Sequence, residues 1–390
     1  MESWQPSLLI LGTRGIPASH GGFETFAERL ALFLVERGWH VGVYCQEEVK
    51  QVDTRFRSSS WRGIEQINVA VASTGPRATL EFDWHCVRDA ASRPSVCLVL
   101  GYNGAVFLPY LRLKSRKIIT NMDGIEWRRP KWSIGVRAWF WVNEWIAAWT
   151  SHRLVADHPI IADHLARRRS RSVTAMIPYG GDTISAAPKS CVRALGLEPN
   201  RYFVSIARIE PDNSILQIVE AFSRRRRGAK LAVLGDIDNS IPYHRAVRDA
   251  AGEEVVLTGA IYDKVTVEAL RFYARAYIHG HMVGGTNPSL VAAMGAGNAI
   301  IARDNEFNRW TAGAAGFYFN SVDDCDALID RMLHDDDAIE SAQAAGRARA
   351  TSHFAWSDVL SAYEHELVSL SRGTKIAPEQ SLSPAASRNP

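Results

Sequence analysis

The sequence predicts an α/β protein of two Rossmann-like domains, each with a mostly parallel, doubly wound sheet. Three observations lead to this prediction. Short apolar runs alternate with segments of helical periodicity, and the alternation restarts after a polar stretch near residues 183–200. The chain, with 390 residues, is also long enough for two hydrophobic cores. Hydrophobic residues make up 46% and charged residues 22%, a balance typical of globular proteins.

The expected strands are short and apolar, and helical periodicity separates them. Phe26, Leu30, Phe33 and Leu34, for example, recur at helical spacing between the first two apolar runs. The runs that we interpret as strands are residues 8–11, 41–45, 96–100, 117–120, 153–156, 173–177, 202–206, 230–234, 254–258, 277–279 and 299–302.

These runs predict an N-terminal domain over residues 1–185 and a second domain over residues 186–352. A helix over residues 353–372 is expected to cross the junction. Residues 373–390 are rich in Ser, Pro and Ala without periodicity, so we expect a disordered tail. Open parallel sheets bind ligands at the carboxyl ends of their strands. Two such domains that face each other would form a central cleft for two substrates.

Charge and cysteine usage exclude several classes of protein. A net charge of only +3 argues against nucleic acid as a partner. The Arg-rich runs 167–169 and 224–227 are interpreted as solvated helix ends, with sites for phosphate or anionic lipid as the alternative. The five cysteines are scattered and predict neither a zinc site nor a disulfide framework. Cys45 and Cys97 lie in strand-like runs and are expected to be buried free thiols.

Hydropathy predicts a cytoplasmic protein. The N-terminal residues lack the basic region and long apolar stretch of a signal peptide. No window contains 18 uninterrupted apolar residues, so we expect no membrane span. Peripheral contact with the inner face of the membrane stays open.

The loop after the first expected strand is the first candidate site. It contains Gly12, Arg14, Gly21, Gly22 and Glu24. Glycines let the backbone approach a ligand closely, and the glycine pair just before a helix leaves N–H groups available for an anion. A glycine-rich turn without a ligand is the alternative. Since the loop lacks GxGxxG, a nicotinamide-dinucleotide site has little support.

The second candidate site follows the expected strand over residues 117–120. Asp123 and Glu126 lie where residues at a strand end project into a crevice. A carboxylate there could bind a sugar hydroxyl or accept a proton. An Asx turn or a helix cap is the alternative for Asp123, because it precedes a glycine.

Tryptophans recur in the segment that follows. Trp141, Trp145 and Trp149 are spaced four residues apart and share one helical face. Core packing is the more frequent reason for such a stripe. The alternative is an amphipathic surface that holds a lipid-linked acceptor at a membrane interface.

The third candidate site combines a strand end with a helix start. Thr286, Asn287 and Ser289 surround the predicted N-terminus of a helix with Pro288 in its first turn, and such a terminus suits a diphosphate. Arg208 follows the first expected strand of the same domain and could neutralise a diphosphate leaving group. A surface ion pair with Glu210 is the alternative for Arg208.

Several segments together resemble one family. They read GTRGIPASHGGFET, NMDGIEW, ARIEPDN, YIHGH, GGTNPSL and ARDNEFNR, in this order along the chain. The chain is similar, from about residue 7 to residue 365, to the rhamnosyltransferase-like branch of the retaining GT-B glycosyltransferases (glycosyltransferase family 4 type) of capsule and exopolysaccharide synthesis.

The resemblance implies a GT-B fold with an N-terminal acceptor domain and a C-terminal nucleotide-sugar domain. Asp123 and Arg208 are then the expected catalytic residues, with Arg208 also on the donor diphosphate. The acceptor-side residues are those of the first loop together with Glu126. The resemblance implies catalysis without a metal or another cofactor. The expected donor-binding residues are Arg208, Gly259, Gly284, Gly285, Thr286, Asn287 and Ser289.

The chain departs from the wider superfamily at four positions. Gly284 and Ala292 stand where the E-x7-E pattern has its two glutamates, the second of which contacts the nucleotide ribose. The resembling branch also has glycine at the position of Gly284, but it does not have alanine at the position of Ala292. Asn213 replaces a second cation, and Trp310 stands where an acid is usual. Loss of a charged hydrogen bond at residue 292 corresponds to roughly 1.5–3 kcal/mol of donor binding.

The sequence therefore predicts transfer of a hexose or deoxyhexose, with dTDP-rhamnose as one candidate donor, to a glycan or lipid-linked acceptor. The main alternative is a catalytically degenerate partner that binds the nucleotide-sugar. A nucleotide-dependent epimerase or oxidoreductase is a further alternative, but it would need GxGxxG and a Tyr-x-x-x-Lys pair, and neither occurs in a suitable place.

Overall fold

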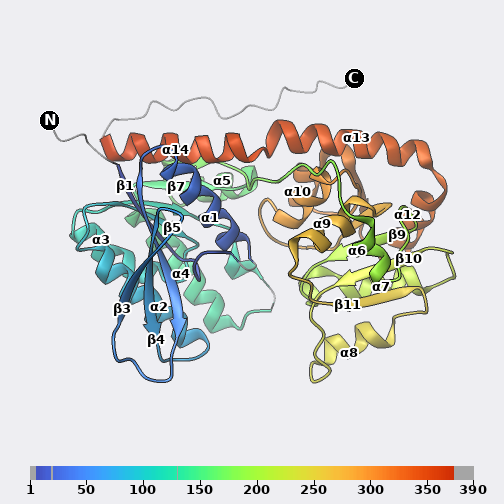
Figure 1. The fold of residues 1–390 in the computed structure, drawn as a ribbon, viewed down its shortest axis with the longest axis horizontal. Coiled ribbons are helices and arrows are strands. Elements are labelled where there is room, and N and C mark those ends of the chain that lie inside the picture. Colours follow the sequence, from blue (N-terminus) through green and yellow to red (C-terminus); the bar gives the residue numbers. More distant parts are fainter. Residues whose placement is uncertain (1–5, 19–20, 130, 373–390) are drawn as a thin grey trace. The chain divides into compact units, whose positions relative to one another are not determined.

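The computed structural model of the chain describes residues 6–18, 21–129 and 131–372 (Figure 1). It divides into two compact units. Unit 1 comprises Met1–Arg128, Trp132–Pro178 and Ser357–Pro390, and unit 2 comprises Arg129–Lys131 and Tyr179–Trp356. The change of unit at Pro178 lies near the boundary expected at residue 185. The predicted tail, residues 373–390, lies outside the described residues.

Unit 1 contains an eight-stranded sheet in the order β3-β4-β2-β1-β5-β6-β7-β8. All pairs are parallel except the β3–β4 hairpin. The central strands are buried along nearly their whole length, which requires helices on both faces. The strands are β1 (Ser7–Leu11), β2 (His40–Glu48), β3 (Phe56–Trp61), β4 (Ile64–Val71), β5 (Val96–Leu100), β6 (Lys117–Asn121), β7 (Arg153–Ala156) and β8 (Thr174–Met176).

The helices of unit 1 follow from right-handed crossovers. The chain passes from β1 to β2 on one side and returns from β4 to β5 on the other, so α1 and α2 cover opposite faces of the sheet. The described helices of this unit are α1 (Gly22–Val35), α2 (Pro76–Ala90), α3 (Leu108–Leu113), α4 (Ile134–Thr150), α5 (Pro159–Ala166) and α14 (Trp356–Arg372), with short 3-10 turns at 105–107, 126–128 and 171–173.

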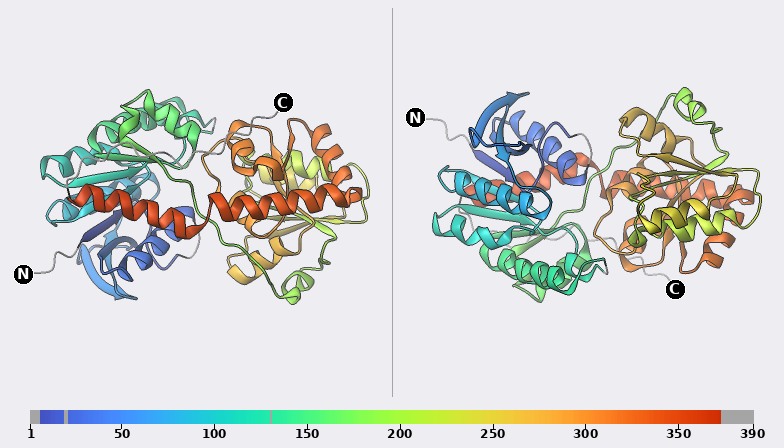
Figure 2. Two further views of the ribbon diagram at one scale, coloured as in Figure 1. Left: turned by 90° about the horizontal axis from the view of Figure 1, so that it is seen from above. Right: turned by 90° about the horizontal axis from the view of Figure 1, so that it is seen from below.

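Helix α14, from the end of the described chain, packs on unit 1 next to α1 (Figure 2). The rings of Phe26 and Tyr363 lie with their centroids 4.6 Å apart. Glu366 pairs with Arg153 of β7 through Nε at 2.7 Å. Residues 357–372 therefore complete the core of unit 1, although unit 2 precedes them in the chain.

Unit 2 contains a fully parallel six-stranded sheet in the order β11-β10-β9-β12-β13-β14. Its strands are β9 (Tyr202–Ile206), β10 (Lys230–Leu234), β11 (Val255–Gly259), β12 (Ala276–His279), β13 (Ala299–Arg303) and β14 (Gly316–Phe319). Its helices are α6 (Lys189–Ala194), α7 (Ile215–Ser223), α8 (Pro242–Asp249), α9 (Lys264–Phe272), α10 (Pro288–Gly295), α11 (Glu306–Ala312), α12 (Val322–His334) and α13 (Asp336–His353), and short 3-10 turns cover 211–213 and 313–315.

Successive strand residues of unit 2 enter two separate cores. Val204 of β9 packs with α9 and α10, whereas its neighbour Phe203 packs with α7 and α12. Ala232 and Val233 of β10 divide in the same way. This alternation is the two-residue period of a strand, and it places helices on both faces of the sheet.

The structure confirms two α/β domains with parallel sheets, and every expected strand is present within about three residues of its predicted ends. Cys45 and Cys97 are buried free thiols, as expected. The sequence analysis missed β14 and the β3–β4 hairpin. Arg62 and Gly63 form the hairpin turn with φ of 50° and 83°, the two positive angles that a tight two-residue turn needs.

The interpretation of the tryptophan stripe as core packing was wrong for Trp141 and Trp149, whereas Trp145 is partly buried. Trp141 and Trp149 of α4 are exposed, and the polar side chains of Asn143 and Glu144 are buried instead. Glu144 accepts hydrogen bonds from His164 at 2.9 Å and from Arg168 at 2.6 Å. Burial alone would raise the pKa of Glu144, but these bonds outweigh it and hold the pKa below its usual range.

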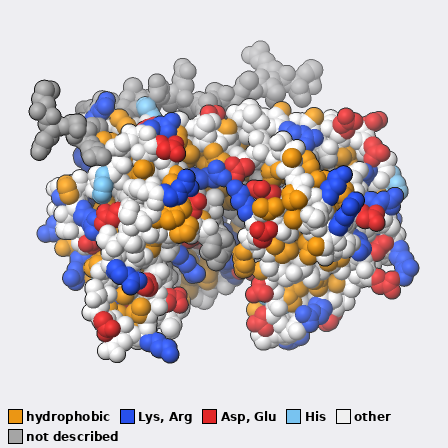
Figure 3. Space-filling model, in the orientation of Figure 1, with side chains coloured by type: hydrophobic (Ala, Val, Ile, Leu, Met, Phe, Trp, Pro, Cys, Tyr) orange, Lys and Arg blue, Asp and Glu red, His pale blue; other side chains and the backbone are white. Residues whose placement is uncertain are grey.

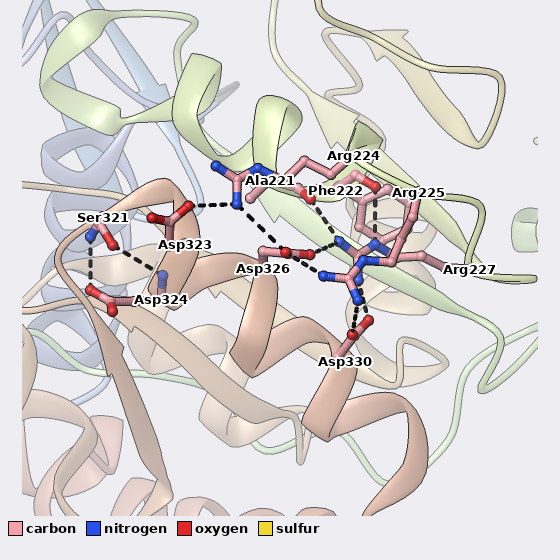
Figure 4. A network of polar contacts seen from close by, with 10 residues as sticks. All are labelled: Ala221, Phe222, Arg224, Arg225, Arg227, Ser321, Asp323, Asp324, Asp326 and Asp330. Carbon is pink, nitrogen blue, oxygen red and sulfur yellow. Dashed lines mark hydrogen bonds and ion pairs between the residues drawn. The ribbon is translucent and has the colours of Figure 1, made fainter.

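A network of ion pairs joins the end of α7 to α12 (Figure 4). Its centre is Asp326, which accepts from Arg225 and Arg227 at 2.5 Å each. Burial alone would raise the pKa of Asp326, but the hydrogen bonds from both arginines outweigh it and lower the pKa. The other charged members are Arg224, Asp323 and Asp330.

The Arg-rich run 224–227 thus lies at a helix end, as expected, but it is only partly solvated. The Arg227 side chain is fully buried, whereas that of Arg226 is 82% exposed. Elsewhere, basic and acidic side chains are interspersed over the face shown in Figure 3.

Replacement of Arg227 should cost far more stability than replacement of its neighbour. Arg227→Ala removes one partner of a buried network, so we expect a loss of about 3–5 kcal/mol in the free energy of unfolding. Arg226→Ala removes an exposed pair with Glu253 and should cost about 0–1 kcal/mol. Urea unfolding of both variants would measure this difference, and equal losses would contradict the structural role of the network.

Candidate functional site

The crossover direction of unit 2 changes at β9, which lies between β10 and β12. Such a switch opens a crevice at the carboxyl ends of the two strands that diverge, here β9 and β12. Arg208 follows β9, and residues 280–287 follow β12. The Met282 N–H donates to the Asp212 carbonyl at 2.9 Å, which fixes the two loops together. The predicted donor residues therefore lie at one strand edge.

Arg208 is well placed for a ligand and also has a protein partner. Its side chain is 72% exposed, and Nη1 lies 3.4 Å from Glu210 Oε1. The ion pair considered in the sequence analysis is therefore present. An exposed pair at this distance contributes little to stability, so a diphosphate could replace the carboxylate at small cost.

The start of α10 is held firmly against the end of β9. The Ser289 hydroxyl lies 2.7 Å from the Tyr277 hydroxyl, and Arg271 donates to it at 3.1 Å. Ser289 and Tyr277 both donate to the Ile206 carbonyl, at 3.3 and 3.1 Å. The predicted donor residue Ser289 thus has its side chain in a network that fixes the helix.

The remaining predicted donor residues lie around this helix start or at the end of β11. Asn287 caps α10 by accepting from the Ser289 N–H at 2.9 Å, and Thr286 is buried. Gly284, beside Gly285, has φ of +147°, which side chains rarely adopt, so a glutamate would be strained there. Gly259 ends β11, two strands from β9, and its carbonyl accepts from the Gly235 N–H at 3.1 Å.

Two stacked imidazoles lie at the end of β12, and the sequence analysis did not single them out. The rings of His279 and His281 have centroids 4.3 Å apart and are inclined by 10°. Both ring nitrogens of His279 and Nδ1 of His281 lack a hydrogen-bond partner among the described residues. The available signal was the sequence His-Gly-His directly after an apolar run.

The environment keeps both imidazoles neutral. Burial lowers the pKa of His279 well below its usual value. Burial and the positive charges of Arg129 and Arg208 lower the pKa of His281 from 6.5 to about 3, against the opposing charge of Glu210. A dianionic ligand beside Arg208 would favour the protonated imidazole of His281.

Ala292 lies one turn into α10 and is partly buried. Its methyl group can form no hydrogen bond, so α10 offers no carboxylate at the position that resembles the ribose contact of the wider superfamily. Nothing in unit 2 explains the alanine.

The acceptor-side residues of the first loop lie at the corresponding edge of unit 1. There the crossover direction changes at β1, between β2 and β5. Gly12 has φ of +82°, and a Cβ there would overlap the Leu100 carbonyl oxygen, so only glycine fits. Glu24 of α1 accepts from the Arg14 N–H at 3.1 Å, and Gly21 and Gly22 begin the helix.

Asp123 and Glu126 lie beyond β6 in the same unit. The Asn121 side chain accepts from the Asp123 N–H at 2.9 Å, so an Asx turn is present, but Asn121 makes it and not Asp123, as the alternative interpretation had it. Asn121 in turn donates to the hydroxyl of Tyr363 in α14 at 2.8 Å. The Glu126 N–H donates to the Tyr102 hydroxyl at 2.9 Å. The candidate catalytic residues Asp123 and Arg208 therefore belong to different units.

Comparison with known proteins bears mainly on the fold. A family model described as a domain of unknown function, DUF1972, matches residues 5–182. A search of the curated proteins finds no match.

Several solved structures cover nearly the whole chain. A sucrose-phosphate synthase from Thermosynechococcus elongatus is 16% identical, with a TM-score of 0.75 over 95% of this chain and 100% of that one. An α,α-trehalose-phosphate synthase from Burkholderia xenovorans, in complex with glucose-6-phosphate, is 11% identical, with a TM-score of 0.72 over 93% and 100%. Anabaena HepE, in complex with UDP, is 13% identical, with a TM-score of 0.69 over 94% and 100%.

These likenesses show the fold. The chain has the two Rossmann-like domains of the GT-B architecture, as the sequence predicted. The roles assigned to individual site residues stay predictions. The expected independence from metal also stays a prediction. The described part of the chain contains no group of three His, Cys, Asp or Glu residues that could hold an ion.

The low pKa of His281 should make the protein sensitive to acid. Between pH 6.5 and about 3 the unfolded chain binds a proton at this imidazole and the folded chain does not, so stability falls as the pH falls. His281→Gln should therefore lose less stability than the wild type between pH 6.5 and 4.5. Thermal unfolding across this range would measure the effect, with the exposed His40→Gln as a control. If the melting temperature fell equally with pH in all three proteins, the buried, neutral state of His281 would be contradicted.

Proposed function

We propose that the protein is a glycosyltransferase that moves a sugar from a nucleotide-sugar to a glycan or lipid-linked acceptor. One observation carries the proposal: Arg208 and the start of α10 lie together at the switch point of unit 2. The chain also has the fold of the synthases to which it is similar. HepE, which shares this fold, was solved with UDP.

The chemistry of this edge suits a departing nucleoside diphosphate. Arg208 supplies a permanent positive charge, and the N-terminus of α10 supplies partial positive charge. Both stabilise negative charge that develops on the leaving group, so the proposal needs no metal. Asp123, which lies in a left-handed turn with φ of 49°, would contact the acceptor in unit 1.

The finer details rest on the resemblance of the sequence motifs. We propose a hexose or deoxyhexose donor such as dTDP-rhamnose, transfer with retention, and a role in surface polysaccharide synthesis. In the mechanism that the resemblance implies, a phosphate oxygen of the donor accepts the proton of the acceptor hydroxyl. The protein then supplies positioning and electrostatic stabilisation more than a strong base.

The second candidate is a partner that binds the nucleotide-sugar without transferring it. The alanine at residue 292 favours this alternative, since a ribose contact would be missing. Nucleotide release separates the two functions. With a panel of UDP-, dTDP- and GDP-sugars and a lipid-linked acceptor pool, an enzyme releases nucleotide when donor and acceptor are both present. A binding partner shows donor affinity without release.

Arg208→Ala should weaken nucleoside-diphosphate binding without a matching loss of stability. We expect a loss of about 1.5–3 kcal/mol in binding free energy, the usual contribution of a charged hydrogen bond. Because the side chain is mostly exposed, the melting temperature should hardly change. Titration calorimetry with UDP and dTDP would measure the affinity, with Arg226→Ala as the control. Unchanged affinity for each nucleotide that the wild type binds would rule out the donor role.

We also propose that unit 1 contacts the membrane surface through α3 and α4, as a peripheral protein. Ile134, Trp141 and Trp149 of α4 and Leu113 of α3 are exposed. No helix in the described ranges is long and apolar enough to span a bilayer. Exposed tryptophans on an amphipathic helix are typical of an interfacial position.

The charges around these side chains fit an anionic surface. Arg112 and Lys114 flank Leu113, and Arg137 lies one turn from Ile134. The carboxylate of α4, on Glu144, is buried and paired. Each exposed basic residue adds about 1 kcal/mol of attraction to an anionic leaflet.

Removal of two tryptophans should therefore abolish membrane binding. The Trp141→Ser, Trp149→Ser double variant should sediment much less with phosphatidylglycerol vesicles than the wild type, and neither protein should bind phosphatidylcholine alone. Tyr262→Ser removes an exposed aromatic residue of unit 2 and serves as the matched control. Equal sedimentation of wild type and double variant would contradict the proposed surface.

A further inference from the structure

A cavity of about 220 Å³ opens at the switch point of unit 1. The residues after β1 and β5 line it, together with the starts of α1 and α3 and the middle of α2. Its apolar walls include Phe23, Phe82 and Leu108. A hollow at a switch point that combines apolar walls with polar groups is a usual setting of a small-molecule site.

The most unusual lining residue is Asp83, which the sequence analysis did not single out. It lies in the middle of α2 and is partly buried. No described residue donates a hydrogen bond to its carboxylate or pairs with it. Its carboxyl group lines the cavity and is therefore available to hydrogen-bond a ligand hydroxyl.

The backbone is shaped to admit this carboxyl group. A Cβ at Gly104, after β5, would overlap Asp83 Oδ2, so the carboxyl group occupies the space that a side chain would take. Burial raises the pKa of Asp83 to about 7. Near neutral pH the group is therefore present in both forms, and the protonated form can donate a hydrogen bond as well as accept one.

Other polar groups converge on the same hollow. Glu24 and Arg14 line it, and both also line a second cavity of about 430 Å³. Gln46 is common to the two cavities as well. The Glu24 carboxylate is held in place by the Arg14 N–H at 3.1 Å and the Thr13 hydroxyl at 3.4 Å. The two hollows are therefore neighbours along one edge of the sheet.

We propose that the cavity around Asp83 binds a single sugar ring of the acceptor, with the Asp83 carboxyl group as the contact that selects one of its hydroxyls. The aromatic walls suit the apolar face of a sugar, and the carboxyl group suits its hydroxyls. The neighbouring cavity would take the adjoining part of a glycan. A site built around one buried hydrogen bond rejects analogues that lack the hydroxyl. This inference rests on the proposed glycosyltransferase function.

Ligand-observed NMR with the full chain tests the inference without knowledge of the natural acceptor. The probes are methyl glycosides of neutral hexoses and deoxyhexoses, measured by saturation transfer. At least one glycoside should bind the wild type, and Asp83→Leu should weaken this binding at least tenfold. Asp83→Asn keeps the shape and hydrogen-bonding capacity of the side chain and should retain most of the glycoside binding. Gly104→Ala, which places a methyl group where the Asp83 carboxyl group lies, should also weaken glycoside binding.

Two controls separate this site from the donor site and from a structural role. Arg208→Ala should bind the glycoside normally, and Asp83→Leu should bind UDP or dTDP as the wild type does. A failure of nucleotide binding in the wild type would therefore count against the proposed function and not against this cavity. Since the carboxyl group has no partner among the described residues, Asp83→Leu should melt at or above the wild-type temperature.

Four results would overturn the inference. They are no glycoside binding by the wild type, unchanged glycoside binding by Asp83→Leu, loss of glycoside binding in Arg208→Ala, and a fall of the Asp83→Leu melting temperature. The last would mean that the carboxyl group supports the fold.

Discussion

Both units depend on a central strand with parallel partners at both edges and side chains packed on both faces. In unit 1 this strand is β1, between β2 and β5, and in unit 2 it is β9, between β10 and β12. The crossover that follows this strand and the one that follows its neighbour (β5 or β12) run to opposite sides, so the loops at the carboxyl ends of the two strands diverge. The space between these loops holds the cavity of unit 1 and the Arg208 edge of unit 2. Burial of the central strand therefore determines where each unit can bind a ligand.

Around these switch points the polar contacts are of two kinds. Some are fully satisfied and fix the frame: Tyr277 and Ser289 tie α10 to β9, and Tyr363 holds Asn121, which positions the Asp123 turn. Others lack a hydrogen-bond partner among the described residues, such as the partly buried Asp83 in unit 1 and the buried His279 in unit 2. Buried polar groups without partners lower stability, so proteins retain them mainly where they serve a function.

The sequence could predict the fold well because its signals are local. Buried parallel strands are continuous apolar runs, and the switch-point loops carry glycine at positions such as Gly12 that no other residue can occupy. The edge hairpin was harder, because β3 is largely exposed and lacks an apolar run. Asp83 could not be found this way. It lies within an amphipathic helix, and only the return crossover from β4 to β5 brings it to the loop after β1.

The exposed tryptophans of α4 show why periodicity alone could not decide between core and surface. A helix with apolar residues on most of its circumference has no obvious buried face. The partners of its polar residues then determine which face is buried. Asn143 caps the 3-10 turn before α3 by accepting from the Val106 N–H at 2.8 Å, while Glu144 pairs with Arg168 and His164. These partners are distant in the sequence, and together they turn the polar side of α4 inward. Because these buried hydrogen bonds and charges fix which side of α4 faces the core, Trp141 and Trp149 are left exposed.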